Sequence, residues 1–215
     1  MRHRTYSLPR LIAWVAIAVL ALYVFPPFHV RHIGRRGVKT DANLADADVA
    51  MIATEFWNNR LAVSAVPPTE ARVLLDALNR DPAAAGHLYG RRPGIGGPLF
   101  YFVSGEARVE STDHTGVWLD PGVPGPIRIV LQTGPIFGSA LRDATGLLNL
   151  DDFSSFQFNE LGAQLNRLAE THGEPPLRNG AKVGSVVQFL AAGQLRQTPG
   201  DVPTLKLVPI RVRLK

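Results

Sequence analysis

Cysteine is absent from this sequence of 215 residues. Without a thiol the chain can form no disulfide framework, no cysteine-ligated zinc or iron–sulfur site and no thiol nucleophile. It also offers no N-terminal cysteine to which a lipid could be attached. These absences exclude several classes of secreted scaffold, metalloprotein and enzyme.

Most of the chain carries no excess of positive charge, although the net charge of the whole sequence is +5. Residues 1–40 hold seven basic residues and no acid, whereas residues 41–215 hold 16 basic residues and 18 acids, a net charge of −2. A nucleic-acid-binding domain carries its basic excess on the folded part, because contacts with phosphates supply most of the affinity. The distribution of charge therefore predicts no nucleic-acid partner.

The remaining composition is that of one ordinary globular domain. Hydrophobic residues make up 46% of the chain and charged residues 19%. Residues 41–215 are long enough to bury a core of their own and too few to require two domains. We predict a single domain over 41–215.

One apolar run, Leu11–Phe25, contains no charged residue. As a helix it would reach about 22 Å, somewhat short of a hydrocarbon core of about 30 Å. Trp14 and Tyr23 stand near its ends, which is typical of a membrane interface. A cleaved signal peptide is the alternative, but bulky residues occupy the place of a small-residue cleavage pattern. We favour an uncleaved membrane anchor over residues 1–28.

Residues 29–40 form a basic linker between the apolar run and the domain. Three basic residues precede the run and four follow it closely. The positive-inside rule compares these two flanks, and here they are nearly balanced. The charges therefore leave the orientation of the anchor open.

The first part of the domain, residues 41–90, has the pattern of two helices. Asp41 caps a helix that runs to about Ser64 and has apolar residues on one face. A pair of prolines breaks the chain before a second helix, which Thr69 caps, and a short third turn is expected over Ala83–Tyr89. We predict that the two helices pack against each other as a hairpin.

Two segments are predicted to be loops. Arg91 to Pro98 is rich in glycine, but it precedes a strand, whereas a dinucleotide-binding loop follows one. A flexible connection is the favoured interpretation. Glu174–Gly180 contains an Asn-Gly turn signal and is expected to be the second loop.

From Leu99 onward the sequence changes to short runs that are typical of strands. A helix from about Phe158 to Gly173 separates the third strand from the fourth of five, which is the order of an OB-type Greek-key barrel. A break at Ser104-Gly105 predicts a bulge or strong bend in the first strand. The fold class is therefore α+β, with an OB-like barrel over 99–215. The predicted strands are Phe100–Ser111, Val117–Leu119, Ile127–Gln132, Val186–Leu195 and Leu205–Lys215.

The last predicted strand alternates between apolar and basic residues. With a period of two, Ile210, Val212 and Leu214 are expected to face the barrel interior. Its basic face is a solvated surface or a contact for an acidic partner or a lipid headgroup. That face consists of Arg211, Arg213 and Lys215.

A polar stretch between the third strand and the following helix is the best candidate for a site. Its carboxylates and one arginine could bind a metal or a sugar, or act as acid and base. The alternative is a loop whose carboxylates cap turns, with Arg142 and Asp143 in an ordinary ion pair. This alternative is favoured, because no nucleophile or well-placed histidine stands nearby. The candidate residues are Arg142, Asp143, Thr145, Asn149, Asp151 and Asp152.

Four stretches resemble a bacterial family of unknown function, the predicted periplasmic lipoproteins of domain of unknown function 2291. They are EFWNNRL (55–61), LLDALNRDPAAAGHLYG (74–90), GIGGPLFYFVSGEARV (94–109) and GPIFGSALRDATGLLNLDDF (134–153). The resemblance implies a single-pass protein of the bacterial inner membrane, with its N-terminus in the cytoplasm and its domain in the periplasm. It also implies a role beside sugar ABC-transport systems, and it supplies no catalytic residues.

The chain departs from the family in one respect. Many members have the form of lipoproteins, whereas this sequence has no cysteine to acylate. We therefore expect the apolar helix to replace the lipid as the tether.

The leading functional hypothesis is a non-catalytic module, without cofactor or metal, that binds a small ligand or a transporter component. Its binding residues would be Arg142, Asp143, Asn149, Asp151 and Asp152. The second hypothesis is a metal-dependent or hydrolytic enzyme that uses the carboxylates of Asp143, Asp151 and Asp152. A third, single-strand nucleic-acid binding, requires aromatic platforms beside basic residues. The only dense aromatic cluster, at 100–102, has no basic stripe beside it.

Overall fold

The computed structural model describes residues 48–94 and 96–215. The predicted anchor at Leu11–Phe25, the basic linker and the expected helix cap at Asp41 lie outside these residues. Within them, no helix combines the length and the hydrophobicity that crossing a bilayer requires.

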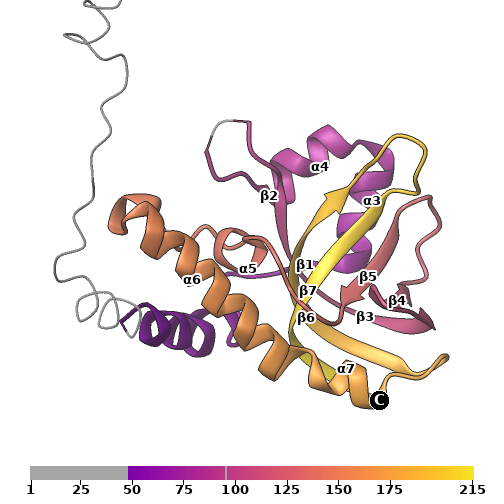
Figure 1. Cartoon of the computed structure of the whole chain (residues 1–215). Helices are drawn as coiled ribbons and strands as arrows, with labels where there is room; N and C mark the ends of the chain where they lie inside the picture. Colours follow the sequence, from indigo (N-terminus) through magenta and orange to yellow (C-terminus); the bar gives the residue numbers. More distant parts are fainter. Residues whose placement is uncertain (1–47, 95) are drawn as a thin grey trace, which may run out of the picture. The chain divides into compact units, whose positions relative to one another are not determined.

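Five strands close into a barrel (Figure 1). They are β3 (Phe100–Thr112), β4 (Gly116–Asp120), β5 (Arg128–Gln132), β6 (Val186–Arg196) and β7 (Thr204–Leu214). The order of pairing is β3, β4, β5, β7, β6, and β6 pairs again with β3. β5 and β7 are parallel, whereas the other neighbours are antiparallel. This connectivity is that of the OB fold, and the predicted barrel is confirmed.

The barrel interior is closed by α3 (Ala71–Arg80). Before it, the short strand β1 (Thr69–Glu70) pairs in parallel with β3, and the Glu70 side chain accepts a hydrogen bond of 3.0 Å from the backbone N–H of Val73. The cap of α3 is therefore Glu70, one residue after the predicted Thr69. Leucines at helical spacing on α3 are fully buried among the inward-facing strand residues, which removes most of the apolar surface of the helix from water. They are Leu74, Leu75 and Leu78.

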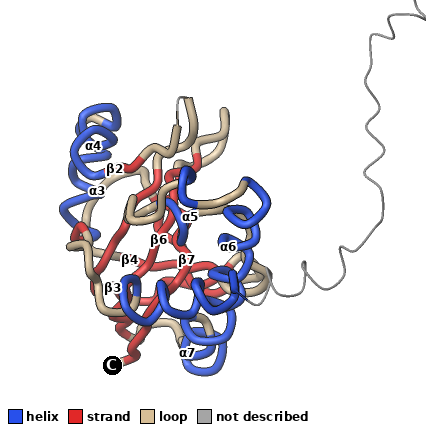
Figure 2. Tube along the Cα trace, turned by 90° about the vertical axis from the view of Figure 1, so that its left-hand side faces the viewer, coloured by secondary structure: helices blue, strands red, loops and turns tan. Residues whose placement is uncertain are grey.

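A second set of helices covers the outer face of β3, β6 and β7. It comprises residues 48–56, their continuation as the π-helix η1 (Trp57–Leu61), α5 (Ala140–Asp143), α6 (Ser155–Leu168) and the π-helix η3 (Ala169–Gly173). Apolar side chains of these helices pack on Phe100, Phe102 and Leu190 to form a core separate from the barrel interior. Figure 2 shows the strands between α3 and α4 (Pro82–Tyr89) on one side and α5 and α6 on the other.

The predicted helical hairpin is wrong. Helix 48–61 belongs to the outer core, whereas α3 belongs to the barrel interior. Between the two helices the chain forms β1, which pairs with the edge of β3. The chain therefore passes from one side of the sheet to the other at β1. The partner of α3 is instead α4 (Pro82–Tyr89), which Asp81 caps by accepting two backbone hydrogen bonds. Helical periodicity identified the helices but not the faces on which they pack.

Of the bulge or strong bend predicted at Ser104-Gly105, the bulge is wrong. Pairing between β3 and β6 is unbroken from Tyr101 to Arg108. Gly105 is explained by close packing, because a Cβ there would lie 2.8 Å from the Cβ of Ala71 at the start of α3. The register of β3 shifts instead between Val109 and Ser111, where the strand pairs with β4.

A second shift in register changes the face of the last strand. Between β6 and β7, Leu190 pairs with Arg211 and Ala191 pairs with Pro209, so Ile210 is the extra residue of a bulge. Ile210 is buried in the outer core, not in the barrel as predicted, whereas Val212 lies in the interior. The expected loop at Glu174–Gly180 likewise forms a short helix, α7 (Pro175–Gly180).

Candidate functional site

A cleft lies on the outer side of the barrel, in the described part of the chain. Its volume is about 590 Å³. The walls come from β2 (Gly90–Arg91) and the loop after it, the start of β3, α5 and the first turns of α6. The capping box of Ser154 and Gln157 fixes the start of α6 at this cleft. Segments distant in the sequence thus meet at one hollow.

Arg142 and Asp143 form one wall of the cleft as a bidentate ion pair. Arg142 Nε donates to Asp143 Oδ1 at 2.7 Å, and its Nη2 donates to Oδ2 at 2.9 Å. Only 11% of the Arg142 side chain and 3% of the Asp143 side chain are exposed. Arg142 also donates to the backbone carbonyl of Phe158 at 3.0 Å and stacks 3.8 Å above the centre of its ring. The pair is therefore rigid, and each charge offsets the other.

The other candidate residues separate into two groups. Asn149 lines the cleft and caps the short 3₁₀ helix η2 (Leu150–Asp152), accepting from the backbone N–H of Asp151 at 3.3 Å. Asp151 and Asp152 are exposed and are not among the residues that line the cleft. Thr145 is buried, and its hydroxyl accepts a long bond of 3.4 Å from the backbone N–H of Leu147.

The predicted carboxylate cluster is therefore not assembled in the cleft. Of its members only Asp143 lines the cleft, and both of its oxygens accept hydrogen bonds from Arg142. Across residues 48–94 and 96–215, no three histidine, aspartate or glutamate side chains are grouped so that they could hold a metal ion. This geometry gives the hydrolytic hypothesis no support.

Two arginines at the cleft were missed by sequence reasoning. Arg91 and Arg92 begin the segment that we predicted to be a flexible connection. Arg91 is held in β2 opposite Phe100, and Arg92 Nη1 donates to the carbonyl of Gly97 at 2.9 Å. The two adjacent basic residues were the available signal, but only the fold shows that they face the polar stretch around Asn149.

The cleft carries a positive charge. Arg142 is neutralised by Asp143, whereas neither Arg91 nor Arg92 forms an ion pair with any described residue. The charge of Arg92 also acts on Tyr101, where it opposes the rise in pKa that burial causes. A ligand with a negative group would therefore be favoured at this end of the cleft.

The rest of the lining is suited to a small polar molecule. Pro98, Leu148 and Leu150 give apolar surface, and Asn149 and Asn159 provide amide groups. A few convergent polar groups on an apolar wall are typical of ligand sites, whose volumes run from about 300 to 1,000 Å³. The lining of the cleft therefore offers apolar contact and hydrogen-bonding groups to a small polar ligand.

Comparison with known proteins agrees with this architecture. The family model described as predicted periplasmic lipoprotein (DUF2291) matches residues 16–213. The crystal structure of an OB-fold protein from Thermotoga maritima MSB8 is similar to this chain with a TM-score of 0.64 and 20% sequence identity. The match covers 78% of this chain and 98% of the other, and at this identity it shows the fold alone. No curated protein matches the sequence.

Proposed function

We propose a function from one premise: the chain belongs to the DUF2291 family of predicted periplasmic lipoproteins. Membership gives a periplasmic, membrane-associated protein with an OB-fold domain. In our proposal that domain is a non-catalytic binding module, and the cleft beside Arg142 holds a small polar ligand.

The cleft is the observation that carries this proposal. Its volume of about 590 Å³ accommodates a small molecule. Arg142 is fixed by Asp143 and by Phe158, so the wall needs no reorganisation when a ligand binds. The amides of Asn149 and Asn159 lie on the same lining and match the donors and acceptors of sugar hydroxyls.

Ligand binding is tested by thermal unfolding of the purified protein with a panel of neutral and acidic monosaccharides. A ligand at 100 times its Kd stabilises the native state by about 2.7 kcal/mol, which raises Tm. Asn159→Ala should reduce the shift, whereas Asn58→Ala, an exposed asparagine on η1, should leave it unchanged. If no sugar of the panel raises Tm at any concentration, the proposal is contradicted.

We further propose that the apolar run Leu11–Phe25 tethers the domain to the inner membrane, and that the module serves a sugar transporter of the ABC type. The tether is supported by the sequence, which has no cysteine for a lipid anchor. The transporter role is tested by co-purification of the full chain from detergent-solubilised membranes, followed by identification of its partners. Repeated purification without any transporter subunit would remove this part of the proposal.

A further inference from the structure

A second hollow adjoins the cleft. It has a volume of about 440 Å³ and shares Pro98, Phe100 and Ser139 with the cleft as lining residues. Its other walls come from β6, β7 and the loop before α5. The two hollows therefore lie next to each other across Pro98, Phe100 and Ser139, and one elongated molecule can reach both.

The second hollow is also cationic. Arg196 near the end of β6 and Lys206 near the start of β7 line it. Neither side chain forms an ion pair with a described residue. Together with Arg91 and Arg92, they give each hollow its own pair of cations.

Gly193 of β6 lines the second hollow, at a point where β6 passes very close to the backbone of β7. A Cβ at this position would lie 1.9 Å from the carbonyl oxygen of Lys206, so no other residue fits without a shift of the backbone. Gln132 and Gln194 also line the hollow and carry amide groups. The hollow therefore combines open space, hydrogen-bonding groups and positive charge.

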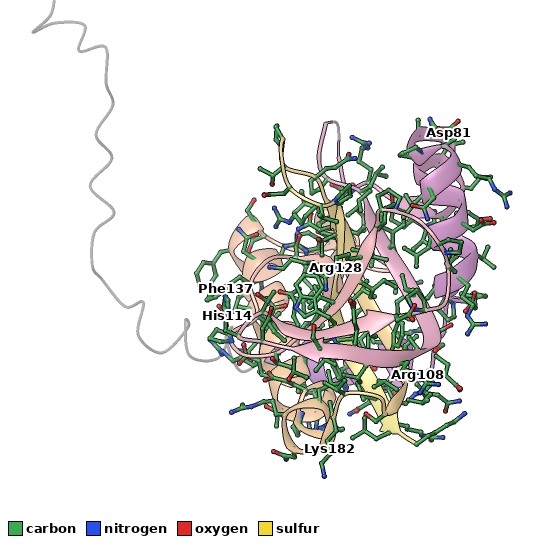
Figure 3. All side chains as sticks on the ribbon, turned by 90° about the vertical axis from the view of Figure 1, so that its right-hand side faces the viewer. Asp81, Arg108, His114, Arg128, Phe137 and Lys182 are labelled. Carbon is green, nitrogen blue, oxygen red and sulfur yellow. The ribbon has the colours of Figure 1, made fainter. Side chains whose placement is uncertain are left out.

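An exposed aromatic ring stands at the rim. Phe137 is 84% exposed and projects from the loop between β5 and α5 (Figure 3). Gly138, with φ of +103°, and Ser139 follow it and lead into α5. An aromatic face beside polar groups offers apolar contact to the C–H face of a sugar ring.

We infer that the two hollows form one extended site for an acidic oligosaccharide. Carboxylates of separate sugar units bind Arg91 and Arg92 at one end and Arg196 and Lys206 at the other, while amides bind the hydroxyls. This inference rests on the proposed function, since it uses the same cleft. An acidic peptide is the competing occupant, and the lining amides together with the exposed ring of Phe137 favour the glycan.

The experiment measures binding of oligogalacturonates to the full chain in detergent by titration calorimetry, using the monomer, the trimer and the hexamer. The hexamer should bind about tenfold or more tightly than the monomer, because a second pair of cations is engaged. Its affinity should fall as salt rises, since exposed charges are screened over about 8 Å at 0.15 M ionic strength. Maltohexaose of equal length should bind more weakly.

Charge-neutral variants separate the two hollows. R196Q combined with K206Q, and R91Q combined with R92Q, should each weaken hexamer binding about tenfold, and each should remove one of the two sites at which the monomer binds. R213Q is the matched control, because Arg213 is exposed on β7 and lines neither hollow. Thermal unfolding of each variant reports whether it is folded.

The possible failures are distinct. Equal affinity for monomer and hexamer, or no effect of R196Q with K206Q, overturns the two-part site and leaves the proposed function intact. Tighter binding of hexaglutamate than of the hexasaccharide overturns the assignment to a glycan. If no sugar binds, neutral or acidic, both the inference and the proposed ligand-binding function are lost.

Discussion

At the scale of single residues, the pair Arg142–Asp143 shows how burial changes the meaning of a sequence feature. Adjacent opposite charges are common on surfaces, where they contribute little. Here the carboxylate is only 3% exposed, and three guanidinium nitrogens of Arg142 are engaged in hydrogen bonds. Removal of either partner leaves the other charge poorly solvated.

We therefore predict that Asp143→Ala lowers the free energy of unfolding by about 3 kcal/mol, because breaking a buried pair strands the remaining charge. Urea unfolding measures the change. Asp151→Ala is the control, and since Asp151 is exposed its effect should stay within about 0.5 kcal/mol. If both substitutions lowered the free energy of unfolding equally, the difference between the buried Asp143 and the exposed Asp151 would be contradicted.

Glu106 leads to a prediction about pH. Hydrogen bonds from Lys215 and then Gln188 lower the pKa of Glu106 below its ordinary value. A lowered folded-state pKa contributes stability above the unfolded pKa of about 4.3, and this contribution is lost as the pH falls through the folded pKa.

The stability difference between the wild type and Glu106→Gln should therefore be constant above about pH 5.5 and shrink as the pH falls below about 4.3. Urea unfolding at a series of pH values measures it. Asp76→Asn provides a comparison with another exposed carboxylate, on α3. If the stability difference stayed constant down to pH 3, the contribution of the lowered Glu106 pKa to stability would be refuted.

At the scale of elements, close contacts between backbones decide where glycine is required. Gly193 in β6 approaches the carbonyl of Lys206 in β7, so an added Cβ would stand 1.9 Å from that oxygen. Gly162 in α6 is also buried, but a Cβ there would meet its first neighbour, Arg142 Nη1, at 3.8 Å, an ordinary contact. Close packing therefore requires glycine at position 193 but not at position 162.

Alanine substitutions at these glycines should have opposite effects. Gly193→Ala should cost about 1–3 kcal/mol or more, since the neighbouring backbone must move. Gly162→Ala should stabilise by about 0.5–1 kcal/mol, because alanine restricts the unfolded chain and suits a helix. Thermal and urea unfolding of the pair test this, and a stabilising Gly193→Ala would be the contrary result.

At the scale of the whole molecule, our proposal assigns tethering to the apolar run at the N-terminus and ligand binding to the folded domain. A charge in the middle of a spanning segment costs about 2.5–3.5 kcal/mol. Ile17→Arg should therefore shift the full chain from carbonate-washed membranes into the supernatant.

Thermal unfolding of the released Ile17→Arg chain should match that of the wild type, because the domain has its own core. Arg4→Gln, outside the apolar run, is the control and should leave the chain in the membrane fraction. Retention of the Ile17→Arg chain in washed membranes would show that another attachment holds it.

The sequence by itself determined the five strands, the helix between the third and the fourth, and hence the barrel. These depend on local periodicity, which a pattern of apolar residues records directly. It also placed Arg142, Asp143 and Asn149 in one polar stretch, and the three residues do line one cleft.

Only the tertiary structure decided which faces meet. It put helix 48–61 and α3 on opposite sides of the sheet, and it moved Ile210 from the interior to the outer core through a bulge. It also brought Arg91 and Arg92 to the cleft and left Asp151 and Asp152 outside it. The physical reason is that register, bulges and packing depend on contacts between residues far apart in the chain, which the local pattern does not record.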